Sequence, residues 1–293
     1  MELRVPKGAE PPPDGWAHRE AVVNGVRLHY VEAGAGPLVV LLHGFPEFWY
    51  AWRRQIGPLA AAGFRVLAPD LRGYNLSDKP RGANAYRVEA LTADVAGLIR
   101  HAGERSAAVV GHDWGGMLTW LLPLHHPEIV HKRVILNAPH PAALRRELRR
   151  GTEQLMRSWY VFFFQLPWLP EAMMRAGDFA LLGRMLRRQP VHPGAFTEAD
   201  VAAYKHALAR PGALTAAINY YRAAFRLPAD DRPCPVPTLV LWGEKDAYLG
   251  PRLTEGLERW SPNVRVERIP DASHWIQNDA PEWVNERMIA FLW

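Results

Sequence analysis

The stretch RSAAVVGHDWGGMLTW, residues 105–120, decides the fold. An apolar run ends in Gly-His-Asp-Trp-Gly-Gly, and a second apolar segment follows. This order predicts a buried strand, a sharp turn and a helix, with Asp113 projecting from the turn. The spacing is that of the nucleophile-elbow motif G-x-S-x-G, in which a serine stands where this chain has Asp113. Because the start of a helix favours negative charge, we expect an ionised carboxylate; a plain helix cap is the alternative.

Strands and helices alternate along the chain on both sides of this motif. A hairpin is expected over 21–33, turned at Asn24 and Gly25. Further strands are predicted at 37–44, 64–70, 105–111, 132–139, 237–243 and 264–270, and helices at 49–61, 86–103, 252–259, 279–291 and directly after the motif. Such alternation is typical of a mostly parallel sheet that is flanked by helices, the α/β class.

The alternation stops between residues 141 and 231, where no strand-like run occurs. This segment is rich in Arg, Ala and aromatic residues and closes in the proline-dense linker LPADDRPCPVP, residues 227–237. We therefore predict an α/β core formed by residues 1–140 and 233–293, interrupted by a helical cap of residues 141–232. Ligands bind at the carboxyl edge of such sheets, so the inserted helices would form a lid over the site.

Two further residues complete the chain order nucleophile, acid, histidine that an elbow motif requires. Asp246 and His274 each follow a predicted late strand. Because the carboxyl ends of parallel strands meet at one edge, we predict that Asp113, Asp246 and His274 form one catalytic set. We also expect His112 to pack or bond beneath the turn and Glu47 to cap the next helix.

Several motifs together resemble those of the epoxide hydrolases of the α/β-hydrolase fold. They are HGFPEFWYAW (43–52), DLRGYNLSDKP (70–80), GHDWGGM (111–117), GEKDAYL (243–249) and SHW (273–275), and the likeness runs from about residue 20 to the end. It implies that Asp113 attacks an epoxide carbon to form an alkyl ester, which water activated by His274 and Asp246 then hydrolyses to give a vicinal diol. A carboxylate suits this reaction because it is already ionised and because its ester keeps a carbonyl for water to attack.

The resemblance also assigns roles around the nucleophile and in the cap. It implies an oxyanion hole made by the backbone N–H groups of Phe45 and Trp114, with a cis bond between Phe45 and Pro46. It implies that Tyr160 and Tyr221 protonate the opening epoxide. A phenol suits this role because its ordinary pKa of about 10 keeps it protonated at neutral pH.

The aromatic residues of the cap leave two alternatives open. Tyr220 takes the place of Tyr221 if the alignment of the segment NYYR (219–222) moves by one position. Trp114, Trp159 and Phe163 are expected to bind an apolar substrate, although ordinary packing between cap and core explains such residues equally well.

Other functions of the same fold remain as alternatives. A haloalkane or haloacid dehalogenase would also attack carbon through Asp113, and Trp114 could hold the departing halide. Fluoroacetate dehalogenases carry an arginine directly after the nucleophile, where this chain has Trp114, so an anionic substrate is not expected. A ligand-binding protein that has kept a hydrolase shell would not need the whole catalytic set.

Composition limits the cellular setting and the partners. The 293 residues are 48% hydrophobic and 22% charged with a net charge of +5, and no nucleic-acid recognition motif accompanies the basic residues. The first residues, MELRVPKGAEPPPDG, lack the apolar stretch that is typical of a secretory signal, and apolar segments such as 159–169 are shorter than the ~20 residues of a spanning helix. We expect a cytoplasmic protein without membrane or nucleic-acid partners, cofactor or metal, acting on a small apolar epoxide and water and compatible with a homodimer. The single cysteine, Cys234, excludes an internal disulfide.

Overall fold

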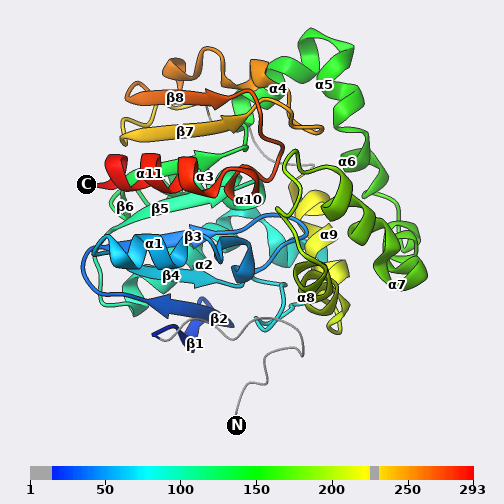
Figure 1. Ribbon diagram of the computed structural model, residues 1–293, viewed down its shortest axis with the longest axis horizontal. Coiled ribbons are helices and arrows are strands. Elements are labelled where there is room, and N and C mark those ends of the chain that lie inside the picture. Colours follow the sequence, from blue (N-terminus) through cyan, green and yellow to red (C-terminus); the bar gives the residue numbers. More distant parts are fainter. Residues whose placement is uncertain (1–14, 225–230) are drawn as a thin grey trace.

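The computed structural model describes residues 15–224 and 231–293, and within them the chain forms a sheet of eight strands (Figure 1). The strand order is β1-β2-β4-β3-β5-β6-β7-β8. The pairs β1–β2 and β2–β4 are antiparallel and the remaining pairs are parallel, which confirms the mostly parallel sheet. The strands are β1 (Ala17–Val23), β2 (Val26–Ala33), β3 (Leu38–Leu42), β4 (Arg65–Pro69), β5 (Ala107–His112), β6 (Val130–Leu136), β7 (Thr238–Gly243) and β8 (Val264–Ile269).

The hairpin and the central strands follow from local sequence. Asn24 and Gly25 both have positive φ, 48° and 73°, and connect β1 to β2 as predicted. Every residue of β3, β5 and β7 is buried, as expected for apolar strands that are covered on both faces. These strands therefore hold rigidly the loops that follow their carboxyl ends.

Helices cover both faces of the sheet. In Figure 1, α1 and α11 pack together on one face, and α2 packs beside α3 on the other. The helical elements of the core are η1 (Trp49–Trp52), α1 (Ile56–Ala61), η2 (Ala83–Tyr86), α2 (Val88–His101), α3 (Trp114–His125), η3 (Pro251–Thr254), η4 (Leu257–Arg259), α10 (Ile276–Asp279) and α11 (Pro281–Leu292).

Two of the predicted helices are wrong in their extent. The segment 49–61 is a 3-10 turn followed by α1, because Pro58 lacks an N–H and is tolerated in the first turn of a helix but not in its interior. The segment 252–259 is two 3-10 turns separated at Gly256, which has a left-handed φ of 67°. The helix predicted around 279–291 is confirmed as α11, which begins at the first-turn proline Pro281.

Between β6 and β7, the regular elements of the described residues 141–224 are all helices, and no strand occurs there. Figure 1 shows these helices beyond the carboxyl ends of the parallel strands, at the right of the view. They are α4 (Pro141–Arg150), α5 (Thr152–Arg157), α6 (Trp159–Phe163), α7 (Leu169–Arg188), α8 (Glu198–Ala209) and α9 (Ala213–Ala224), with a kink in α7 at residues 176–179. The cap limits 141–232 stay a prediction, and part of the linker 227–237 lies outside the described residues.

None of the helices in the described segments combines the length and the apolar character that crossing a membrane requires. The segment at the start of the chain that we inspected for a signal lies almost wholly outside these residues.

Candidate active site

The carboxyl edge of the sheet brings the predicted catalytic residues together. Asp113 follows β5, Asp246 follows β7 and His274 follows β8, so three neighbouring loops supply them. His274 lies between the two carboxylates: its Nδ1 is 2.7 Å from Asp246 Oδ2, and its Nε2 is 3.7 Å from Asp113 Oδ2. The arrangement is that of a nucleophile, a base and an orienting acid.

The turn at Asp113 has the geometry of a nucleophile elbow. Asp113 has φ 50° and ψ −118°, a strained conformation for a residue other than glycine. Its side chain makes no capping hydrogen bond to α3, so the plain helix cap that we considered is wrong. Two glycines permit the close packing of this turn, because a Cβ at Gly44 would overlap the Asp113 side chain and one at Gly115 would overlap the carbonyl of Leu42.

The carboxylate of Asp113 is held ionised. The Phe45 N–H donates to its Oδ1 at 2.7 Å, and the other oxygen faces His274. Burial favours the protonated acid, but His274 and the Phe45 N–H outweigh that effect and hold the pKa of Asp113 below its usual value. The bond between Phe45 and Pro46 is cis, as the resemblance implied. Trp114 N–H opens α3 directly after the carboxylate, and its part in an oxyanion hole stays a prediction.

His274 is held in its charged form. Burial favours the neutral imidazole, but the carboxylates of Asp246 and Asp113 outweigh it and raise the pKa of His274 to about 10. Asp246 is in turn fixed through its Oδ1, which accepts the backbone N–H groups of Tyr248 and Leu249 at 2.7 and 2.9 Å. The site at rest therefore pairs an ionised carboxylate with an imidazolium.

Asn137 is a site residue that our sequence reasoning missed. It follows β6, is fully buried and has φ 38°. Its amide donates to Asp246 Oδ2 at 2.8 Å, and its Oδ1 accepts the Gly243 N–H at 2.8 Å, so it joins the ends of β6 and β7 beneath the acid. The sequence prediction placed Asn137 inside the strand 132–139, whereas β6 ends at Leu136, so its place at the carboxyl edge was not foreseen.

A buried His–Glu pair supports the site from below. His112 Nδ1 lies 2.8 Å from Glu47 Oε2, and its Nε2 lies 2.8 Å from the carbonyl of His274, so the expectation that His112 bonds beneath the turn is confirmed. The prediction that Glu47 caps the next helix is wrong. Its carboxylate instead accepts the Gly44 N–H at 3.0 Å, because the loop before Phe45 turns back over the elbow.

Two phenols of the helical insertion face the nucleophile. Tyr160 lies on α6 and Tyr221 on α9, with their ring centroids 5.8 Å apart, and both line the same cavities as Asp113. Burial, with the charge of Asp113 next, raises the pKa of both phenols well above the usual value, so they stay protonated. Tyr220 turns elsewhere: its hydroxyl donates to the Arg72 carbonyl at 2.7 Å and it lines neither cavity.

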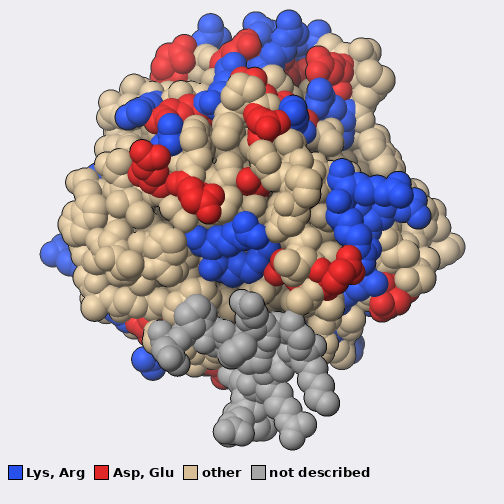
Figure 2. Space-filling view, in the orientation of Figure 1, with Lys and Arg blue, Asp and Glu red and all other residues tan. Residues whose placement is uncertain are grey.

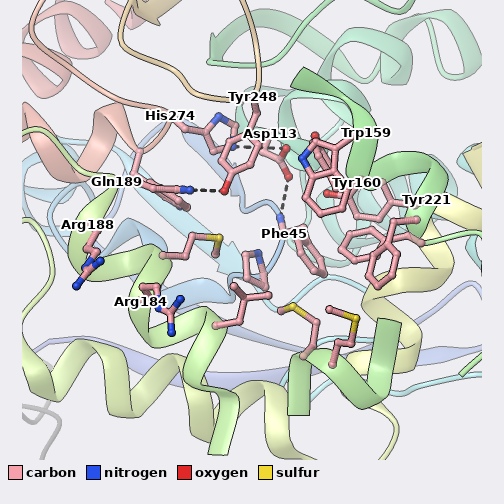
Figure 3. A pocket seen from close by; sticks show the side chains of 18 residues that line it. Phe45, Asp113, Trp159, Tyr160, Arg184, Arg188, Gln189, Tyr221, Tyr248 and His274 are labelled. Carbon is pink, nitrogen blue, oxygen red and sulfur yellow. Dashed lines mark hydrogen bonds and ion pairs between the residues drawn. The ribbon is translucent and has the colours of Figure 1, made fainter. Parts of the chain in front are cut away.

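A cavity opens on each side of this group. The larger, about 440 Å³, is lined by His274, Trp159 and Phe163 (Figure 3). The smaller, about 310 Å³, is lined by Trp114 and other apolar residues of α3, α4 and α6. Asp113, Tyr160 and Tyr221 line both cavities, so the reacting centre lies between two spaces that could each take one arm of a substrate.

The larger cavity also contains polar residues that we did not predict. The Tyr248 hydroxyl donates to Gln189 Oε1 at 2.7 Å and so ties the loop after β7 to the end of α7. Arg184 and Arg188 of α7 line the same cavity, on the side away from Tyr160 (Figure 3). Across the two described segments, no group of three or more His, Cys, Asp or Glu side chains is arranged to hold a metal ion.

Comparison with known proteins supplies the family. The model of the α/β-hydrolase fold family matches residues 37–281, which confirms the predicted fold class. The AB hydrolase superfamily protein YfhM of Bacillus subtilis is 43% identical over 92% of this chain and 95% of its own length. Human "Epoxide hydrolase 4" is 39% identical over 92% of this chain and 76% of its own length.

A solved structure of an epoxide hydrolase is also similar to this chain. A variant of an epoxide hydrolase from Bacillus megaterium, complexed with its product (R)-3-[1]naphthyloxy-propane-1,2-diol, superposes with a TM-score of 0.87 at 35% identity, covering 94% of this chain and 99% of that one. The chain belongs to the epoxide hydrolases, a family of enzymes with the α/β-hydrolase fold.

Proposed function

We propose that this protein hydrolyses an epoxide to a vicinal diol through a covalent ester on Asp113. The observation that carries the proposal is that an ionised carboxylate and two protonated phenols line the same cavities from opposite sides. Family membership supports it, since the human relative and the Bacillus megaterium enzyme are both named epoxide hydrolases.

Ring opening uses the two sides of the cavity together. Asp113 Oδ2 attacks one epoxide carbon, the carbon–oxygen bond of the ring breaks, and Tyr160 or Tyr221 donates its proton to the departing oxygen. Without a donor, an alkoxide would form in an apolar space at a high free-energy cost. The product of this step is an alkyl ester of Asp113 with a free hydroxyl on the neighbouring carbon.

Ester hydrolysis uses the base on the opposite side. Once Asp113 is esterified, His274 gives up its proton and the phenolate left by ring opening regains one. The neutral imidazole then takes a proton from water, which attacks the ester carbonyl, and Asp246 stabilises the imidazolium that forms. The imidazolium returns this proton to the departing alkoxide. The oxygen that becomes an oxyanion is Oδ1, which already accepts the Phe45 N–H in the free site. Collapse of this intermediate releases the diol and leaves one oxygen of water in the carboxylate of Asp113.

The paired phenols favour this reaction over dehalogenation. A halide leaves as a stable anion and needs no proton, whereas an epoxide oxygen does. The two cavities are compatible with substituents on both epoxide carbons, and their apolar linings agree with the predicted apolar substrate. A binding protein without activity would turn over no member of an epoxide panel, so steady-state assays on terminal and internal epoxides separate that alternative.

A single turnover in heavy-oxygen water tests the route. With enzyme in excess over an aryl glycidyl ether, we expect the heavy oxygen in the Asp113 peptide and not in the diol. His274→Gln, which lacks the base, is expected to accumulate protein carrying the mass of the substrate. Label found in the diol and absent from the Asp113 peptide would mean that water attacks the epoxide directly, and would exclude the ester.

A further inference from the structure

The loop that carries Asp246 is held from two sides. On the side of the sheet, its carboxylate contacts His274 and accepts a hydrogen bond from the Asn137 amide. On the other side, the backbone of the loop lies against α5, a helix of the insertion. Figure 2 shows acidic and basic side chains mixed at the top of the view, where α4 and α5 lie in Figure 1, so the outer face of this helix is charged and exposed to solvent.

Gln154 joins α5 to this loop through its whole amide group. Its side chain is buried, although α5 lies at the surface. Its Nε2 donates to the Tyr248 carbonyl at 2.9 Å and to Ser158 Oγ at 3.0 Å, and its Oε1 accepts the Gly250 N–H at 3.0 Å. Because burial of an amide without partners is costly, these hydrogen bonds fix the side chain and the loop to each other.

Arg157 binds the same loop at the acid itself. Its Nη1 donates to the backbone carbonyl of Asp246 at 2.6 Å, and its Nη2 donates to Glu153 at 3.1 Å, one helical turn earlier. The carboxylate depends on the backbone that α5 holds, because its Oδ1 accepts the N–H groups of Tyr248 and Leu249. The contacts of α5 therefore fix the turn that directs the carboxylate toward the imidazole.

The same segment of the insertion carries one of the two phenols. Tyr160 lies three residues after Arg157, and its ring contacts that of Tyr248 edge to face, with the centroids 5.5 Å apart. Between the two, Ser158 accepts the hydrogen bond from Gln154. The segment that contains the phenol is thus bound to the loop that contains the acid.

We propose that Gln154 and Arg157 are positioning residues, which hold the loop of Asp246 so that its carboxylate stays aligned with the imidazole of His274. The proposal rests on the epoxide hydrolysis proposed above, in which the imidazole acts in ester hydrolysis and the phenols in ring opening. The two phenols also contact each other, so ring opening keeps its donors when the contacts between α5 and the loop are removed. The insertion therefore contributes to both steps, since it supplies the proton donors and fixes the base.

Removal of the contacts of α5 separates the two steps. In the variant Gln154→Leu/Arg157→Leu, mixed with an aryl glycidyl ether and rapidly quenched, intact mass measures the esterified protein over time. We expect ring opening to keep its rate and hydrolysis of the ester to slow about tenfold, so that esterified protein accumulates. Arg146→Leu is the matched control, because the guanidinium of Arg146 joins α4 to the carbonyls of Arg252 and Glu255; we expect both rates to stay unchanged. A double variant with both rates unchanged would overturn the positioning role.

A titration without epoxide separates this proposal from the proposed reaction. Nuclear magnetic resonance of labelled imidazole nitrogens is expected to show His274 losing its proton about one pH unit lower in the double variant, because the carboxylate of Asp246 is held less closely to it. The Arg146→Leu control is expected to titrate like the unmodified protein. A shifted titration in a protein that hydrolyses no epoxide would refute the reaction and support the positioning role. An unchanged titration in a double variant that hydrolyses epoxides at the normal rate would overturn the positioning role and leave the reaction standing.

Discussion

Removing the charge of Asp113 is expected to change His274 from an acid into a base. The imidazole lies between two carboxylates, which raise its pKa to about 10 and keep it protonated at neutral pH. A protonated imidazole cannot accept a proton from water. Esterification of Asp113 removes one of the two charges, and Asp113→Asn removes the same charge while nearly conserving the shape of the side chain.

The size of the effect follows from the distance between the two groups. His274 Nε2 lies 3.7 Å from Asp113 Oδ2. At that separation and an effective dielectric constant of about 20, the attraction is about 4 kcal/mol. Its loss corresponds to about a thousandfold increase in the acid dissociation constant of the imidazolium, which moves its titration from about pH 10 into the neutral range.

Nuclear magnetic resonance of protein with labelled imidazole nitrogens measures this titration directly. We expect His274 to titrate at alkaline pH in the unmodified protein and near neutrality in Asp113→Asn, while histidines remote from the site, such as His131, titrate alike in both. Identical titration of His274 in the two proteins would refute the argument, as would a neutral His274 at pH 7 in the unmodified protein.

The same shift links stability to pH. Because the pKa of His274 in the folded protein lies above its ordinary value of about 6.5, the imidazolium contributes stability that is fully present below pH ~6.5 and is lost as pH rises through about 10. The contribution is at most about 5 kcal/mol. Urea unfolding between pH 7 and 10 is therefore expected to show a steeper loss of stability in the unmodified protein than in Asp113→Asn.

Substitutions at the phenols, at Gly44 and at Asn137 test the rest of the site. The double variant Tyr160→Phe/Tyr221→Phe is expected to slow ring opening at least a hundredfold. Tyr220→Phe is expected to keep activity, because the Tyr220 hydroxyl donates to a backbone carbonyl. The reverse result would identify Tyr220 as a proton donor. Gly44→Ala is expected to lower kcat about a hundredfold, because the added methyl group would overlap the Asp113 side chain and so disturb its hydrogen bond with the Phe45 N–H; unchanged kcat would contradict this. Asn137→Ala is expected to lower kcat about tenfold and to alter the pH–rate profile, because Asn137 donates to Asp246. A lower melting temperature at unchanged kcat would show that Asn137 has only a structural role.

Much of the site follows from chain order alone. Asp113, Asp246 and His274 each come after a predicted strand, and parallel strands bring their carboxyl ends to one edge whatever the length of chain between them. The same reasoning extends to Asn137, since it follows the strand between those of Asp113 and Asp246. It fails for helix limits such as 49–61, where a single proline determines the first turn.

The insertion is less predictable, because its side chains are directed by packing and not by strand order. Tyr220 and Tyr221 are adjacent on α9, so their side chains point about 100° apart. The helical pattern of the sequence does not determine which of the two faces Asp113. Arg184, Arg187 and Arg188 look alike in the sequence, yet only one of them binds Glu198. Their roles depend on the kink in α7 and on the position of α8, which are tertiary features.

The charges of the site impose an order on the two proposed steps. Before reaction, burial and the negative Asp113 raise the pKa of both phenols, so each holds a proton that it can donate to the epoxide oxygen. Ester formation removes the negative charge that held the proton on His274. The base therefore becomes available only after there is an ester to hydrolyse, and one carboxylate serves both as nucleophile and as the group that controls when water is activated.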